Sequence, residues 1–278
     1  MDSTKTRAFR WLNWIGHVLI DNVSLEIGGA EIVKHYGEWL HIFNELTQTS
    51  EKASAYAEMV GNVPKLTQIQ SSNTGSTFNT EEYELYIPLQ FWFCRNPGLA
   101  IPINALTDTD MRLNIKFNTL DNCIWATNQS SSSTYVSTKG SSAVSTSSGA
   151  PSLSDVALYV DYIFLGNDEK NRFKNNNHQY LIEQVQRTPQ TIYQNETSKN
   201  INCNIRYPVK ELIWIVQPNK YTNIEYTQSR GGAQWFNYTD AWDYTNFTGT
   251  PENYYGPGLV GGRGQQNIFY GLPTVNVK

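Results

Sequence analysis

Four histidines are the first residues in this sequence that could bind a metal or transfer protons: His17, His35, His41 and His178. Only His35 and His41 are near neighbours, and their spacing of six does not place both on one helical face, as an i, i+4 pair would. Metal ligation requires such side chains to converge. The spacing therefore predicts no metal site, and we expect no cofactor.

Cys94 is the residue best suited to nucleophilic chemistry, since the neighbouring Arg95 would favour its thiolate. No G-x-S-x-G-like elbow surrounds it, and a cysteine at a strand end usually packs as a small hydrophobe. The sequence has an odd number of cysteines, Cys94, Cys123 and Cys203, and none of them has C-x-x-C spacing. Neither a disulfide framework nor a zinc site is predicted, and we expect reduced thiols.

Two further patterns could belong to an enzyme. Asp108 and Asp110 could mimic the carboxylate pair of a glycosidase, but in a Thr-Asp-Thr-Asp turn such residues more often bond to the local backbone. The Gly-rich stretch 258–266 is not followed by a helical pattern that could hold a phosphate, so it reads as a flexible loop. We expect a protein that is not an enzyme.

Sequons of the Asn-x-Ser/Thr type are candidate glycosylation sites. Asn22 lies in an expected strand, so its sequon is attributed to chance. The other four are Asn128, Asn195, Asn237 and Asn246.

Composition indicates a β-rich protein with large contact surfaces. Aromatic residues make up 13% of the 278 residues and charged residues 17%, against about 25% charged in an average domain. The net charge of -4 gives no basic footprint, so no direct nucleic-acid binding is expected. No apolar run approaches the roughly 18 residues that would cross a bilayer.

The elements that would position these residues begin with a hairpin over residues 17–34, around a Gly-Gly pair. Helical spacing follows over 36–46 and 50–61, with Ser50 expected as N-cap, and residues 62–82 read as a surface loop. Strands are expected at 84–93 and 100–106, ending at sheet edges because Pro88 and Pro102 cannot donate to a ladder. Between them, Asn96-Pro97-Gly98 predicts a turn with positive φ at glycine.

The second half of the chain repeats this pattern. Strands are expected at 111–118, 155–166, 178–186 and 201–218, with a helical turn at 168–175. The Ser/Thr-rich stretch 128–154 reads as a long exposed loop. The polar stretch 187–200 is the expected linker, which leaves 201–278 short for an eight-stranded unit.

Three blocks carry a resemblance to a known family: ELYIPLQFWFCRNPGLAIPINAL, VDYIFLGNDEKNRFKNNNHQYLIEQVQ and YPVKELIWIVQ. Together with the earlier block EIGGAEIVKHYGEWLHIFNEL, they follow the family order over about residues 17–217. The sequence resembles the major capsid proteins of nucleocytoplasmic large DNA viruses.

The resemblance implies an all-β double jelly roll, with short helices inserted in loops. Its expected domains are 1–186, the first jelly roll without its N-terminal strands, the linker 187–200, and 201–278, the start of an incomplete second jelly roll. It further implies a homotrimer that forms pseudo-hexagonal capsomers of an icosahedral virion shell assembled in the host cytoplasm. Implied partners are neighbouring capsomers, minor capsid proteins and, indirectly, an internal membrane layer.

A carbohydrate-binding β-sandwich is the alternative. The aromatic stretch 235–247 could stack its rings on sugars if a strand exposed them. In a capsid protein the same rings would lie in trimer contacts or in an outward loop, because aromatic residues concentrate at interface cores.

Overall fold

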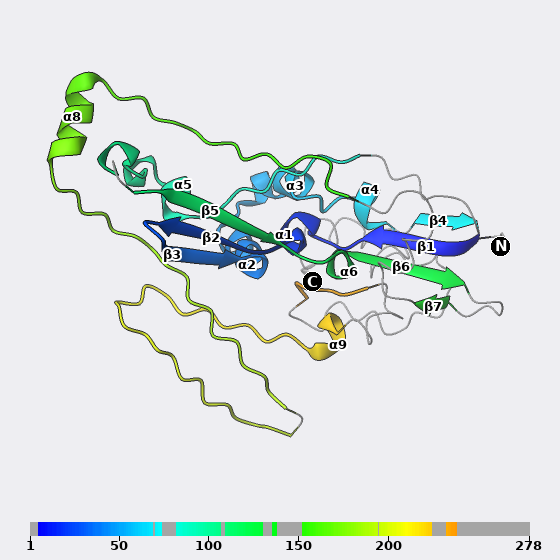
Figure 1. Ribbon diagram of the computed structural model, residues 1–278. Helices are drawn as coiled ribbons and strands as arrows, with labels where there is room; N and C mark the ends of the chain where they lie inside the picture. The colour runs from blue at the N-terminus through cyan, green and yellow to red at the C-terminus, as the bar shows by residue number, and fades with distance from the viewer. Residues whose placement is uncertain are drawn as a thin grey trace.

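Two antiparallel sheets form the frame of the molecule. The computed structural model describes residues 5–68, 70–73, 82–106, 109–129, 135–137, 152–193, 195–223 and 232–237. In these ranges one sheet has four strands in the order β4-β1-β6-β7, and the other has three in the order β3-β2-β5. The sheets lie end to end, with short helices between and beside them (Figure 1).

The three-stranded sheet is built on the expected hairpin. β2 (Ile20–Ile27) pairs with β3 (Ala30–Tyr36), and the linking Gly28 and Gly29 have φ of 61° and 78°. Two successive left-handed residues match the twist of a two-residue hairpin, and glycine adopts that conformation without strain. β5 (Met111–Phe117) pairs with the other edge of β2, which confirms the strand predicted at 111–118.

The core face of this sheet follows the alternation in the sequence. Val23 and Leu25 are 0% and 1% exposed, and Ile27 packs beside them. Leu40 and Phe91 cover them from outside the sheet. Val23, Leu25 and Ile27 therefore share one face as predicted, and Ser24 on the other face is also buried.

The four-stranded sheet was not expected from the sequence. It contains β1 (Lys5–Trp11), β4 (Gln70–Asn73), β6 (Ile124–Gln129) and β7 (Tyr135–Ser137). β4 falls in the stretch 62–82, which was wrongly read as a loop. β7 interrupts the Ser/Thr-rich stretch 128–154, most of which lies outside the described residues. Pairing with β1 satisfies the backbone of the polar strand β4, so its partner outweighs its weak strand propensity.

Of the first four helices in the chain, two confirm predictions and two were not expected. α2 (Gly37–Thr47) and α3 (Ser50–Met59) lie where helical spacing placed them. Ser50 is the first helical residue instead of the N-cap, which is Thr49. α1 (Ile15–Leu19) and α4 (Pro64–Thr67) were not expected. Short helices between strands are thus a feature of this fold.

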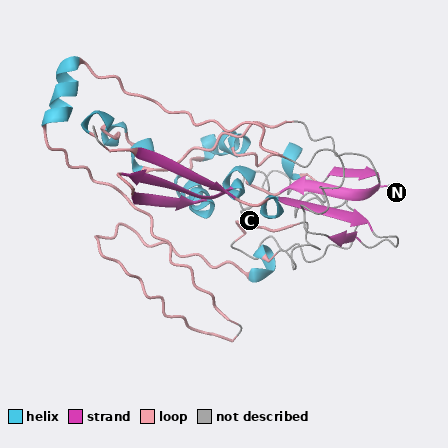
Figure 2. Cartoon of the chain, in the orientation of Figure 1, coloured by secondary structure: helices cyan, strands magenta, loops and turns pink. Residues whose placement is uncertain are grey.

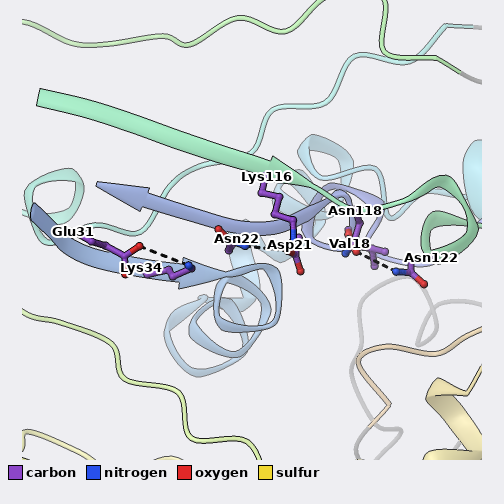
Figure 3. A network of polar contacts seen from close by, with 8 residues as sticks. All are labelled: Val18, Asp21, Asn22, Glu31, Lys34, Lys116, Asn118 and Asn122. Carbon is purple, nitrogen blue, oxygen red and sulfur yellow. Dashed lines mark hydrogen bonds and ion pairs between the residues drawn. The ribbon is translucent and has the colours of Figure 1, made fainter. Parts of the chain in front are cut away.

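Polar side chains tie α1 to the end of β5 (Figure 3). Asn118 Nδ2 donates to Val18 O at 2.8 Å, and Asn122 Nδ2 donates to Asn118 Oδ1 at 3.1 Å. Asn122 belongs to α6 (Leu120–Cys123), which leads into β6. This chain of hydrogen bonds fixes the junction between the two sheets.

The strands predicted at 84–93 and 100–106 are wrong. Residues 82–90 are extended but join no ladder, and the chain continues as α5 (Trp92–Arg95), a 3₁₀ turn (η1, Pro97–Leu99) and a second one (η2, Ile103–Ala105). Side chains along 82–90 still alternate against the core, with Leu85 on one cluster and Ile87 on the other. Pro88 and Pro102 lack the N–H that a ladder requires. The predicted reversal at 96–98 is present, as a 3₁₀ turn without the positive φ expected for Gly98.

The segments expected as strands at 155–166, 178–186 and 201–218 form no ladder (Figure 2). Between the first two lies α8 (Asn167–Asn175), which confirms the helical turn. α9 (Asn219–Thr222) follows the third. The described residues thus form sheets and helices, and the all-β double jelly roll stays a prediction. Among the helices described here, none has the length and apolar character needed to cross a membrane.

Candidate assembly surface

Apolar side chains gather on three extended segments of the second half of the chain. We call residues 152–165, 178–187 and 201–216 the assembly segments. Phe164 is 91% exposed, Leu181 84% and Trp214 83%. The other large exposed apolar residues of these segments are Leu153, Val156, Leu158, Tyr159, Val160, Tyr162, Ile163, Ile182, Ile201, Ile205, Tyr207, Val209, Leu212, Ile213, Ile215 and Val216. Exposure of this extent marks an interaction surface.

The backbone of the assembly segments is also available for contacts. Within the described ranges, none of their backbone N–H or C=O groups bonds to another backbone group. Extended chain with unpaired donors and acceptors is a template for a further strand. The segments therefore offer both apolar area and strand edges to a partner.

Ionic contacts link one of these segments to the helices α5 and α2 and to another assembly segment. Glu183 lies between Arg95 Nη2 at 2.5 Å and Lys210 Nζ at 2.6 Å, and these contacts lower the pKa of its carboxyl, with Lys210 the larger cause. Arg187 Nε lies 3.2 Å from Glu38 Oε2 at the start of α2. Two assembly segments are thereby linked to each other and to the core, an arrangement that no local pattern in the sequence could have shown.

The Gln184 side chain contacts the outer strand of the three-stranded sheet. Its Nε2 donates to Ile32 O of β3 at 2.5 Å, and β3 is the outer strand in the order β3-β2-β5. In the described part of the chain, residues around Gln184 therefore lie beside an edge strand that has no ladder partner on its outer side.

The structure brings His17 and His41 together, which their sequence spacing did not indicate. Their rings lie 5.7 Å apart, whereas His35 stacks on Phe91 at 4.7 Å in the three-stranded sheet. His178 is exposed and lies beside Phe173 after α8. Among the described residues, no three His, Cys, Asp or Glu side chains are grouped to hold a metal ion.

The three cysteines carry free thiols. Cys94 is exposed, yet desolvation raises the pKa of its thiol more than Arg95 lowers it. Desolvation therefore outweighs the effect of Arg95 on the pKa of this thiol. Cys123 is buried, and burial raises the pKa of its thiol to about 12. Cys203 is exposed on an assembly segment.

The remaining enzyme-like patterns do not form a site in the described residues. Asp110 is exposed and lies 3.6 Å from Arg112, while Asp108 falls outside the described residues. The Gly-rich stretch 258–266 also falls outside them. Of the aromatic stretch 235–247, Trp235 and Phe236 pack inward against core residues. Those two rings are not presented for sugar stacking.

The sequons differ in accessibility. Asn195 is exposed in a turn with φ of 73°. Asn237 is buried, and its Nδ2 donates to Gln234 Oε1 at 2.7 Å. Asn22 is half-buried in β2, where its Nδ2 donates to Asp21 Oδ2 at 3.0 Å (Figure 3). Asn128 contributes only its backbone in β6 to the described structure, and Asn246 lies outside it.

Comparison with known proteins finds relatives among viral coat proteins. Residues 2–166 match the family model described as major capsid protein N-terminus. The major capsid protein of Phaeocystis pouchetii virus is 38% identical over 84% of this chain and 48% of its own length. That of Pyramimonas orientalis virus is 43% identical over 73% of this chain and 43% of its own length. The quasi-atomic model of the PBCV-1 virus capsid aligns with 66% of this chain and 40% of that chain, at 26% identity and a TM-score of 0.43.

These matches identify a class of structural coat proteins, not of enzymes. The chain belongs to the family of viral major capsid proteins, and residues 2–166 match the N-terminal part of these proteins. It spans about half the length of the curated relatives it matches. The family resemblance drawn from the sequence blocks is confirmed.

Proposed function

We propose that the chain is a structural capsid protein that trimerises into pseudo-hexagonal capsomers and tiles an icosahedral virion shell. The family match over residues 2–166 carries this proposal. The exposed apolar assembly segments support it, because a chain that functions in a shell needs surface reserved for its neighbours.

The proposed role depends on the shape and symmetry of the assembled trimer. A three-fold trimer whose chains each contribute two similar sandwiches would place six similar units on a hexagonal lattice site. In this proposal residues 1–186 belong to the first jelly roll, 187–200 to the linker and 201–278 to the start of the second. Proposed partners are copies of the chain, minor capsid proteins and, indirectly, an internal membrane layer, with assembly in the host cytoplasm.

The assembly segments would supply contacts within and between capsomers. Their apolar side chains would be buried at about 25 cal/mol per Å² of area removed from water. Their unpaired backbone groups would be satisfied by partner strands. The ionic contacts of Glu183 would keep two segments in position before the partner arrives.

The experiment tests incorporation into particles. The chain, tagged in infected cells, should appear in purified virions and cross-link as a trimer. Phe164→Asp and Trp214→Asp should each reduce incorporation of the chain into virions at least tenfold. Each substitution would bury a carboxylate where an assembly segment contacts its partner. Leu46→Asp is the matched control, because Leu46 is 62% exposed on α2 outside the assembly segments. Absence of the unmodified chain from particles, or equal incorporation of all variants, would refute the proposal.

Asn195 is the acceptor that we propose if the chain carries an N-linked glycan. It is the exposed sequon asparagine of the described residues, whereas the amides of Asn22 and Asn237 are engaged in hydrogen bonds. Asn195→Gln should remove the glycan mass from the peptide that contains it, while Asn237→Gln should leave that mass unchanged. An unmodified Asn195 in purified virions would contradict this assignment.

A further inference from the structure

The outer strand of the three-stranded sheet contains a bulge that a distant segment contacts. The register of β2 and β3 shifts between Leu25 and Glu26, which leaves Ile32 of β3 without a partner residue in β2. Such a bulge interrupts the ladder at the extra residue. Gln184 Nε2 donates to the carbonyl oxygen of Ile32 at 2.5 Å. The Gln184 side chain therefore lies against β3 at the bulge.

Charged side chains anchor the chain on both sides of this hydrogen bond. On one side, Glu183 Oε2 lies 2.5 Å from Arg95 Nη2 of α5. On the other, Arg187 Nε lies 3.2 Å from Glu38 Oε2. The Arg187 guanidinium also lies 5.2 Å from the ring centre of Tyr36, the last residue of β3. These contacts belong to one short segment, which runs along β3 towards the end of the strand.

This segment, residues 183–187, which we call the edge guard, is attached through its side chains. Within the described residues, none of its backbone groups bonds to the backbone of β3. Exposed ion pairs are screened by water and salt, so they hold such a segment weakly. A strand that paired through its backbone would satisfy several groups of the edge at once. Such a strand can therefore displace the edge guard.

The charges on β3 are complementary to those of a second copy of the same strand. Glu31 and Lys34 lie on one face, with Lys34 Nζ 3.6 Å from Glu31 Oε2 (Figure 3). If two copies of β3 met antiparallel about a two-fold axis between Ile32 and Val33, Glu31 of each copy would lie opposite Lys34 of the other. Opposite charges in that position stabilise a pair of strands. The partner that fits this edge is therefore another molecule of the same chain.

We propose that the edge guard keeps the outer edge of β3 closed to a second copy of this chain, and that displacement of the guard opens the edge to antiparallel pairing. The guard and the edge both belong to the described part of the chain, so the proposal does not rest on the capsid role. Loss of the contacts of Gln184 and Arg187 should increase pairing between β3 strands.

The test mixes equal amounts of unlabelled and heavy-isotope chain and treats them with a carbodiimide, which joins a lysine to a carboxylate where the two are in contact. Mass spectrometry then distinguishes Glu31–Lys34 links within one chain from those between a labelled and an unlabelled chain. The double variant Gln184→Ala with Arg187→Gln should increase the links between chains about fivefold, as expected for the loss of one hydrogen bond and one exposed ion pair. Gln186→Ala is the matched control, because Gln186 is an exposed glutamine of the same segment.

The pair Lys116–Asp21 reports whether the sheet of each variant is folded. Lys116 Nζ of β5 lies 2.8 Å from Asp21 Oδ2 of β2, so this link should form within one chain in every protein. A retained Lys116–Asp21 link without an increase in Glu31–Lys34 links between chains would overturn the proposal. An equal increase in Gln186→Ala would overturn it as well.

A second measurement uses the unmodified chain and does not depend on the folding of a variant. A peptide with the sequence of residues 30–36, its ends blocked, is added in excess together with the carbodiimide. We expect this peptide to link to Glu31 or Lys34 of the chain, and a peptide of scrambled sequence to give no such link. Equal links from both peptides, or none from either, would show that the edge of β3 does not pair with a copy of itself.

Discussion

At the scale of single residues, burial lowers the pKa of the His35 imidazole, which keeps this side chain neutral at pH 7. His35 is 3% exposed, and burial, with Arg95 as a second cause, lowers the pKa of its imidazole to about 4. The unfolded chain would bind this proton near pH 6.5 and the folded chain only near 4. Stability is therefore unaffected above pH 6.5 and falls as pH decreases towards 4.

His35→Phe should remove this part of the acid sensitivity. We expect the wild-type chain to lose about 2 kcal/mol more of its free energy of unfolding than the variant between pH 7.5 and 5.0. Urea unfolding at the two pH values measures the difference. Parallel loss in both proteins would show that His35 does not stay neutral in the fold. His178→Gln, at an exposed position, serves as control.

Gly37 is required by a close approach of backbones. A Cβ at this position would lie 2.1 Å from His17 O and 2.3 Å from Ile20 O, where α2 starts against α1. Gly37→Ala should destabilise the fold by about 1–3 kcal/mol or more through overpacking. Gly166→Ala is the control, because the nearest atom to its added Cβ is 3.8 Å away. Equal urea midpoints for the two variants would contradict the contact between α1 and α2.

At the scale of elements, the ionic contacts of Glu183 hold two assembly segments in place. We expect them to contribute little to the free energy of unfolding of the whole chain. The partners of Glu183 are Arg95 and Lys210, and exposed pairs of this kind contribute roughly 0–1 kcal/mol. Glu183→Gln should leave the urea midpoint nearly unchanged. It should increase tryptic cleavage after Lys210 by up to about fivefold, because the anchor of that segment is lost.

Asp161→Asn is the matched control for this change. Asp161 is an exposed carboxylate of an assembly segment and is distant in the sequence from Lys210. Its replacement should leave the cleavage rate at Lys210 as it is in the unmodified chain. A rate that is equal in both variants would show that Glu183 does not hold the segment.

At the scale of the whole molecule, the isolated chain should self-associate. The assembly segments expose Phe164, Leu181 and Trp214 on extended backbone without ladder bonds. Burial of one such side chain contributes about 1.5–3 kcal/mol, and unprotected strand edges recruit other chains. Sedimentation of residues 1–278 alone should show aggregates that grow with protein concentration.

Charged substitutions should separate this surface from general instability. The double variant Phe164→Asp with Trp214→Asp should shift the sedimentation profile towards smaller species, and Leu46→Asp should not. A single soluble species from the unmodified chain, with a cooperative thermal transition, would refute the expectation.

Local patterns were reliable where neighbours in the sequence decide the structure. The Gly28-Gly29 hairpin, the alternation in β5 and the helical spacing of α2 are set by turn chemistry and by side-chain periodicity. The run at 84–93 has the same strand-like alternation, yet it has no ladder partner in the described structure. A strand exists only when a second strand satisfies its backbone, and periodicity does not identify that partner.

By itself, the sequence determined the family, the hairpin and the main helices. The tertiary structure decided the pairing of β1 with β6, the contact between the rings of His17 and His41, and the contacts of Glu183. Each of these joins residues that are distant in the sequence, and such contacts depend on the packing of whole elements. Burial and partner geometry, which arise only after folding, therefore decide which polar residues are neutral, paired or exposed.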